Sequence, residues 1–309
     1  ETADDWEDFR ARRARQPVFG GVIDGVHLER MESDMRNYLA LLAARAPDVA
    51  KEYLAHVQTL KRKDDIYRKL LQVRGTLAQA APAEIAAITM EYLRKPEHDD
   101  EDEGLGLGRR IDGALAHTDE DFLEASPAQG PFYDLLKHAP AVGLKLVRDL
   151  VDSVIAYHVE DKEPEDDDVI VLEMPGGARR FPWTNTYLWS DHSYYYSVTS
   201  ALMALEAWAH ERIDNGDDIA IVIGDVLGDG KPPAAYVLVA VHLILSHWPD
   251  SASAGVPFVG SPELLSLDLD RTIRAGASNV DFLGLRGLHK EPATGPRLAS
   301  LRERISRRA

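Results

Sequence analysis

The feature that most constrains the fold of this chain is the helical spacing of its apolar side chains. From Leu28 to Ala46 an apolar residue recurs every three or four positions, and this spacing gathers side chains on one face of an α-helix. Pro47 interrupts the pattern, which then resumes and predicts further helices that begin near Asp64 and Pro82. Amphipathic helices of the same kind are predicted throughout the second half of the chain, so helices should dominate the fold.

Strand-like sequence is confined to residues 169–183. Two short runs flank Pro175, Gly176 and Gly177, a combination of residues that is typical of a turn between paired strands. We therefore predict a mainly α-helical protein, built as an irregular HEAT-like α-solenoid or helical array with one inserted β-hairpin at about 169–183. A compact all-α bundle is the alternative architecture.

The charge pattern divides the chain into three parts. Seven acidic residues lie between Glu97 and Asp112, followed or separated by glycines, and such a stretch buries too little apolar surface to offset its ordering entropy. We predict an N-terminal helical region at 1–96, an acidic and glycine-rich loop at 97–130, and a C-terminal helical region with the hairpin at 131–309.

Composition excludes several classes of site and partner. The 309 residues include no cysteine, which excludes disulfides, cysteine-ligated zinc and thiol nucleophiles. The net charge of −17 disfavours binding to nucleic-acid phosphates and to anionic membranes. The longest apolar run, Ala234 to Trp248, is too short to span a bilayer comfortably. We expect a cytoplasmic protein without a membrane partner.

The stretch from Trp183 to Glu211 concentrates groups capable of chemistry. It contains Asp191, His192 and Ser193 in a row, but adjacent residues point apart and do not form a catalytic triad. Ser190 or Asp191 is instead predicted to cap a helix that begins near His192. The alternative is an enzyme with a pocket between the hairpin and the helix 192–213, in which Asp191, His192 and Tyr195 carry the acid–base chemistry.

Two further patterns argue against a bound cofactor or metal. The stretch from Gly224 to Pro233 departs from the phosphate-binding loop at two positions, Asp225 and Pro232, so Gly228 is predicted to end a helix instead. His242 and His247 lie five residues apart, which is a poor spacing for one helical face. We predict neither a cofactor nor a metal site.

Residues 130–271, a little under half of the chain, resemble a region of a known group of proteins. The segments FPWTNTYLW, VTSALMALEAWAHERI, VLVAVHLILSHWP and PELLSLDLDR occur in this order, and the region resembles a helical part of very large bacterial proteins. Those proteins carry an NTPase module of the STAND or a related P-loop type, and several belong to anti-phage defence systems. The resemblance implies a scaffold or sensor beside an ATPase, without a nucleotide site of its own.

These observations favour a noncatalytic helical scaffold or sensor that mediates protein–protein or interdomain contacts. Its partner would be a protein: the rest of a longer chain, a second copy, or a foreign trigger. Aromatic and arginine side chains are enriched at interfaces. The candidate contact residues are therefore Arg148, Arg179, Arg180, Trp183, Trp189, Tyr194, Tyr195 and Tyr196.

Overall fold

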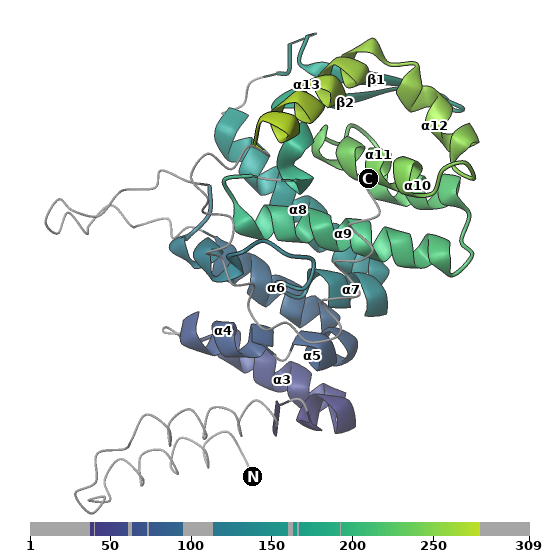
Figure 1. Cartoon of the computed structure of the whole chain (residues 1–309). Coiled ribbons are helices and arrows are strands. Elements are labelled where there is room, and N and C mark those ends of the chain that lie inside the picture. The colour runs from purple at the N-terminus through teal and green to yellow at the C-terminus, as the bar shows by residue number, and fades with distance from the viewer. Residues whose placement is uncertain are drawn as a thin grey trace, which may run out of the picture.

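The structure is a computed structural model, and helices make up most of the part of the chain that it describes (Figure 1). It describes residues 38–39, 41–60, 64–72, 74–94, 114–159, 163–165, 167–191 and 193–278. The acidic run predicted as a loop lies outside these ranges, whereas residues 114–130 of the predicted loop region lie within them.

The N-terminal helices follow one another after short breaks. Pro47 and Pro82 each stand at the first position of a helix, where the missing N–H has no hydrogen bond to lose. The helices predicted to begin near Asp64 and Pro82 are confirmed. The helices in this part are α3 (Pro47–Gln58), α4 (Asp64–Gln72), α5 (Arg74–Ala80) and α6 (Pro82–Leu93).

Two helices, α7 (Phe132–His138) and α8 (Pro140–Val159), come unusually close together. A Cβ atom on Gly143 would lie 2.5 Å from the backbone nitrogen of Leu136. Only glycine leaves room for this approach. The short 3₁₀ helix η2 (His117–Phe122) precedes α7, and an isolated bridge between Arg94 and Leu115 ties the chain before η2 to the end of α6.

The predicted hairpin is confirmed. Strand β1 (Val169–Met174) pairs with β2 (Gly177–Pro182) in antiparallel register, with Val169 opposite Pro182 and Met174 opposite Gly177. Ile170 and its partner Phe181 are both buried, so one face of the hairpin joins the core. The 3₁₀ helix η3 (Thr184–Ser190) follows β2.

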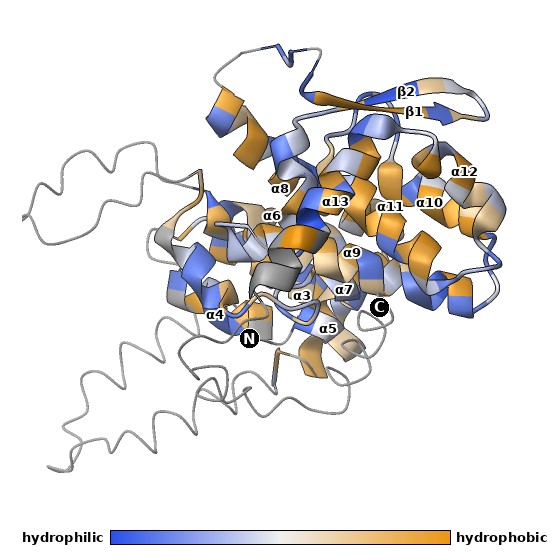
Figure 2. Cartoon of the chain, turned by 45° about the horizontal axis from the view of Figure 1, so that its top comes forward, coloured by the Kyte–Doolittle hydropathy of each residue, from blue (hydrophilic) through white to orange (hydrophobic). Residues whose placement is uncertain are grey.

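Helix α9 is the centre of the C-terminal half. It packs against α7, α8, α10 and α11, and its apolar residues Val198, Leu202 and Leu205 are buried. Figure 2 shows that α10 and α11 are largely hydrophobic, and every residue of α11 from Ala235 to Ile244 is buried. The helices here are α9 (Tyr196–Asp214), α10 (Ile219–Leu227), α11 (Ala235–Ser246), α12 (Ala252–Val259) and α13 (Pro262–Ser278).

The start of α9 differs from the prediction. The helix begins at Tyr196, and the cap comes from Asp119 of η2 rather than from Ser190 or Asp191. The Asp119 carboxylate accepts hydrogen bonds of 2.9 Å from the N–H groups of Tyr196 and Ser197, and a further bond from the Ser197 hydroxyl. The prediction was wrong because it considered only neighbouring residues as caps, whereas a helix end accepts any carboxylate that packing places there.

The hydrophobic core is continuous between the two halves of the chain. Helices α5 and α6 contact α7 and α8, and one buried cluster extends from Ala43 to Leu264. None of the helices in the described ranges combines the length and the hydrophobicity needed to cross a membrane.

Candidate functional site

A chain of ionisable side chains crosses the core between α9 and α11. Glu206 of α9 is fully buried between two histidines. Its Oε2 lies 3.1 Å from Nδ1 of His242 on α11, and its Oε1 lies 3.6 Å from Nε2 of His210, one turn further along α9. Both histidines are buried as well. Charged groups are almost never found at such depth unless they are paired.

The polar chain continues in both directions. His210 Nδ1 shares a hydrogen bond of 2.9 Å with His247 Nε2, near the end of α11. On the other side, His242 Nε2 lies 4.0 Å from Asp191, and Asp191 lies 3.9 Å from Arg271 of α13.

Arg271 extends the polar chain to a buried phenol. Its Nε donates to Asp268 over 2.7 Å, and the Tyr187 hydroxyl donates to the same carboxylate oxygen over 3.1 Å. Burial is the main cause that raises the pKa of Tyr187, so this phenol stays protonated at neutral pH. The network thus joins η3, α9, α11 and α13.

The Glu206 carboxylate is the polar group that the two buried imidazoles share: it lies within hydrogen-bond distance of His242 Nδ1, and His210 Nε2 is its next neighbour. Removal of Glu206 would leave two imidazoles without this partner in the core. Because Glu206, His210 and His242 are almost completely buried, a substrate could reach them only if α9 or α11 moved. In this packing Glu206 and the two histidines are therefore placed to interact with other groups of the protein and not with a substrate.

The candidate acid–base residues from the sequence belong to different contacts. Asp191 joins the polar chain at His242. The Tyr195 hydroxyl lies elsewhere, 2.9 Å from His158 Nε2, and accepts a bond of 3.1 Å from the N–H of Ala114. Burial is the main cause that raises the pKa of Tyr195. His192 lies outside the described residues.

Sequence reasoning missed the histidine network because its members belong to different helices. His242 and His247 meet through His210 and Glu206, not through their own spacing along α11. One signal was present: Glu206 and His210 are four residues apart on a helix, a spacing that lets their side chains meet.

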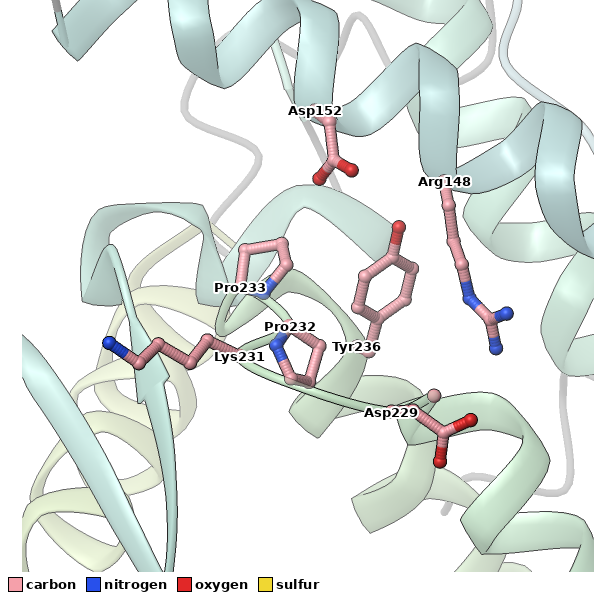
Figure 3. Close-up of a pocket in the computed structure, with 8 residues that line it drawn as sticks. Arg148, Asp152, Asp229, Lys231, Pro232, Pro233 and Tyr236 are labelled. Atoms are coloured by element: carbon pink, nitrogen blue, oxygen red, sulfur yellow. The ribbon is translucent and has the colours of Figure 1, made fainter. Parts of the chain in front are cut away.

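A pocket of about 220 Å³ lies between α8 and the loop that joins α10 to α11 (Figure 3). Gly228 ends α10, as predicted, and has a left-handed φ of +69°, which glycine adopts without strain. The pocket is lined by Arg148, Asp152, Gly228, Asp229, Lys231, Pro232, Pro233 and Tyr236.

Two arginines hold this loop in place. Arg148 of α8 donates to the carbonyl of Asp225 over 2.8 Å, and Arg179 of β2 donates to the carbonyl of Gly228 over 2.5 Å. A Cβ atom on Gly228 would lie 2.9 Å from Nη2 of Arg148. The hairpin also contacts the loop directly, because the N–H of Ala234 donates to the carbonyl of Pro182 over 2.8 Å.

Tyr236 places an unsatisfied hydroxyl at the pocket. The residue is 1% exposed, and its hydroxyl has no hydrogen-bond partner within the described ranges. Figure 3 shows this hydroxyl pointing toward the space between Asp152 and Arg148. Burial is the main cause that raises the pKa of Tyr236, with Asp152 adding to it. Burial also raises the pKa of Asp152, together with the charge of Asp149.

The remaining predicted contact residues differ in exposure. Tyr194 is almost fully exposed and Arg180 is exposed, whereas Trp183, Trp189 and Tyr196 are half-buried.

The largest apolar side chains at the surface of α13 form a stripe. Leu265, Leu269 and Ile273 recur every four residues and are 49%, 61% and 61% exposed. Leu264, on the inward side of the same helix, is buried. Ser261 caps this helix, because the N–H of Leu264 donates to its hydroxyl over 3.4 Å.

The side chains of the described residues form no group of three or more His, Asp or Glu placed to hold a metal ion. No family model matches the chain, and no curated protein matches it.

Proposed function

We propose that this chain is a noncatalytic helical scaffold that binds another protein through the exposed stripe of α13. The observation that carries the proposal is that α13 is apolar on two sides. Leu264 faces the core, and Leu265, Leu269 and Ile273 face solvent. A helix at the surface of a folded protein normally has one apolar side. An additional exposed apolar stripe marks a surface that a partner covers and so removes from contact with water.

The partner in this proposal is a basic amphipathic helix of a separate polypeptide. Helix-in-groove recognition uses apolar anchors at three- or four-residue spacing, which matches the stripe. Glu263 and Asp270 are exposed on the same helix, and the chain carries a net charge of −17. Arginine or lysine beside the apolar face of the partner would complement these charges and accelerate the encounter.

The wider setting proposed for this scaffold is a large bacterial NTPase of the kind found in anti-phage defence, as the sequence resemblance implies. In that setting the helices would stack in a HEAT-like manner and present α13 to the partner. An aromatic and arginine surface formed by Arg180 and Tyr194 would be a secondary contact, since both side chains are exposed.

A matched pair of substitutions tests this function. Leu269→Lys places a charge within the stripe, and Ile221→Lys places the same charge at a site on α10 of similar exposure, 62% against 61%. The probe is a fluorescent peptide of about 18 residues, or five helical turns, with leucines on one face and arginines beside them. Its binding to the full chain is measured by fluorescence anisotropy.

We expect the wild-type chain and the Ile221→Lys variant to bind the probe equally, and Leu269→Lys to bind at least about tenfold more weakly, because a central apolar anchor is lost. Added salt should weaken binding by screening the rim charges. Failure of the wild-type chain to bind, or an equal loss in both variants, would refute the assignment to α13.

A further inference from the structure

We infer that the pocket between α8 and residues 228–233 binds a small zwitterion of the α-amino acid class. In this complex Arg148 and the Tyr236 hydroxyl donate to the carboxylate of the ligand, and Asp152 accepts hydrogen bonds from its ammonium group. The inference does not depend on the proposed function, because the pocket and the α13 stripe share no residue.

Tyr236 is the observation that points to a ligand. Buried hydroxyl groups nearly always have a hydrogen-bond partner, and an unsatisfied one costs about 1–3 kcal/mol. The Tyr236 hydroxyl is buried, lacks a partner among the described residues and borders the pocket. A ligand oxygen would satisfy it, and because the hydroxyl oxygen itself is closed to solvent, the pocket lining must shift to admit that oxygen.

The charges around this hydroxyl define the class of ligand. Arg148 and Asp152 are four residues apart on α8, so they lie on one face of that helix, and Figure 3 shows the Tyr236 hydroxyl pointing toward this face, with the Arg148 guanidinium farther down on the side of Asp229. A positive group and a negative group in the lining beside this hydroxyl suit a small ligand that carries both charges. The pocket lining as a whole has two positive and two negative side chains, Arg148 and Lys231 against Asp152 and Asp229, so it favours a ligand without net charge.

The size of the pocket supports a small ligand. A volume of about 220 Å³ is below the 300–1,000 Å³ of typical drug-sized sites. Two carboxylates in the lining also disfavour a phosphate dianion, in agreement with the incomplete phosphate-loop motif at Gly224 to Pro233.

The pocket is held ready for a ligand by contacts outside it. Arg148 keeps its position through the carbonyl of Asp225, and Arg179 fixes the carbonyl of Gly228. Only one nitrogen of Arg148 is used in this bond, and a guanidinium group has five N–H donors. The other N–H groups of Arg148 are the donors that the inference assigns to the ligand.

Simple ligands separate the two halves of the site. Glycine carries both charged groups, acetate only the carboxylate and methylamine only the ammonium. Their binding to the full chain is measured by ligand-detected NMR titration, with inorganic phosphate as a fourth probe. We expect glycine to bind at least about tenfold more tightly than acetate, methylamine or phosphate, because only glycine engages both Arg148 and Asp152.

Two substitutions, each with a matched control, assign the binding to this pocket. Tyr236→Phe removes the buried hydroxyl and Asp152→Asn removes the carboxylate charge. Their controls are Tyr194→Phe, at an almost fully exposed tyrosine, and Asp250→Asn, at an exposed acid outside the pocket lining. Glycine binding should weaken at least about fivefold in the two pocket variants and remain unchanged in the two controls.

The thermal unfolding of the unliganded variants confirms that they fold. Tyr236→Phe should melt at the wild-type temperature or above it, because it removes an unsatisfied buried group without changing the ring. The inference is overturned if no probe binds, if acetate or phosphate binds as tightly as glycine and identifies an anion site, or if methylamine does so and identifies a cation site. Equal weakening in a pocket variant and its control would overturn it too.

Discussion

Replacing Gly143 by alanine tests the closest helix contact in the fold. The added Cβ atom would lie 2.5 Å from the nitrogen of Leu136 and 2.8 Å from the carbonyl carbon of Leu135. Ordinary van der Waals contacts of a Cβ atom begin at 3.4 Å. Both neighbours are backbone atoms of α7, so no side-chain rotation relieves the clash, and α7 and α8 must separate by roughly 1 Å.

The expected loss follows from two opposing effects. Overpacking of a core costs about 1–3 kcal/mol, and a contact with backbone atoms belongs at the upper end of that range. Alanine is favoured over glycine within a helix by about 1 kcal/mol. The Gly143→Ala variant should therefore be about 2 kcal/mol less stable than the wild-type chain.

Urea unfolding measures this difference, with Gly224→Ala as the control. Gly224 is also helical, in α10, but an added Cβ atom there would have no neighbour within 4 Å. The control should be as stable as the wild-type chain, or up to about 1 kcal/mol more stable. If Gly143→Ala proves as stable as Gly224→Ala, the close approach of α7 and α8 is incorrect.

Three further predictions concern the buried carboxylates. Asp119→Ala removes the cap of α9 and should lower the free energy of unfolding by about 1–3 kcal/mol in urea titrations, whereas Glu120→Ala, at an exposed acid of the same 3₁₀ helix, should cost less. Burial raises the pKa of Asp119 above its ordinary value of 3.8, so the folded chain binds this proton more tightly than the unfolded chain does. The contribution of Asp119 to stability should therefore fall as pH rises from 3.8 through the raised folded pKa, and Asp119→Asn should flatten that part of the pH profile of urea unfolding. Glu206→Ala leaves the buried side chains of His210 and His242 without their shared carboxylate and should lower the free energy of unfolding by about 1–3 kcal/mol, whereas Glu206→Gln, which retains a hydrogen-bonding group, should cost less in the same assay; a loss for Glu206→Gln as large as that for Glu206→Ala would contradict this expectation and show that the carboxylate itself is required.

Several local features of this fold were predictable from the sequence. The hairpin at 169–183 was recognised because a Pro-Gly-Gly turn lies between its strands. The end of α10 at Gly228 and the start of α13 at Ser261 follow from residues with strong preferences for those positions. In each case the residues that decide the structure lie within a few positions of one another.

The polar interactions that define the candidate sites were not predictable in this way. The cap of α9 comes from Asp119, and the helices α7 and α8 and the hairpin lie between this residue and Tyr196 in the chain. Glu206 finds His242 on another helix, and Tyr236 meets the pocket face of α8. The sequence showed which of these side chains are ionisable, but not which would be buried together.

The sequence by itself determined that the chain forms helices with one hairpin, because helical periodicity and turn residues act on the nearest neighbours in the chain. Tertiary structure alone decided which carboxylate caps α9, which imidazoles share Glu206, and which hydroxyl is left unsatisfied beside Arg148 and Asp152. The physical reason is that a buried polar group must pair with whatever group the packing of helices brings to it, and that packing joins residues far apart in the sequence.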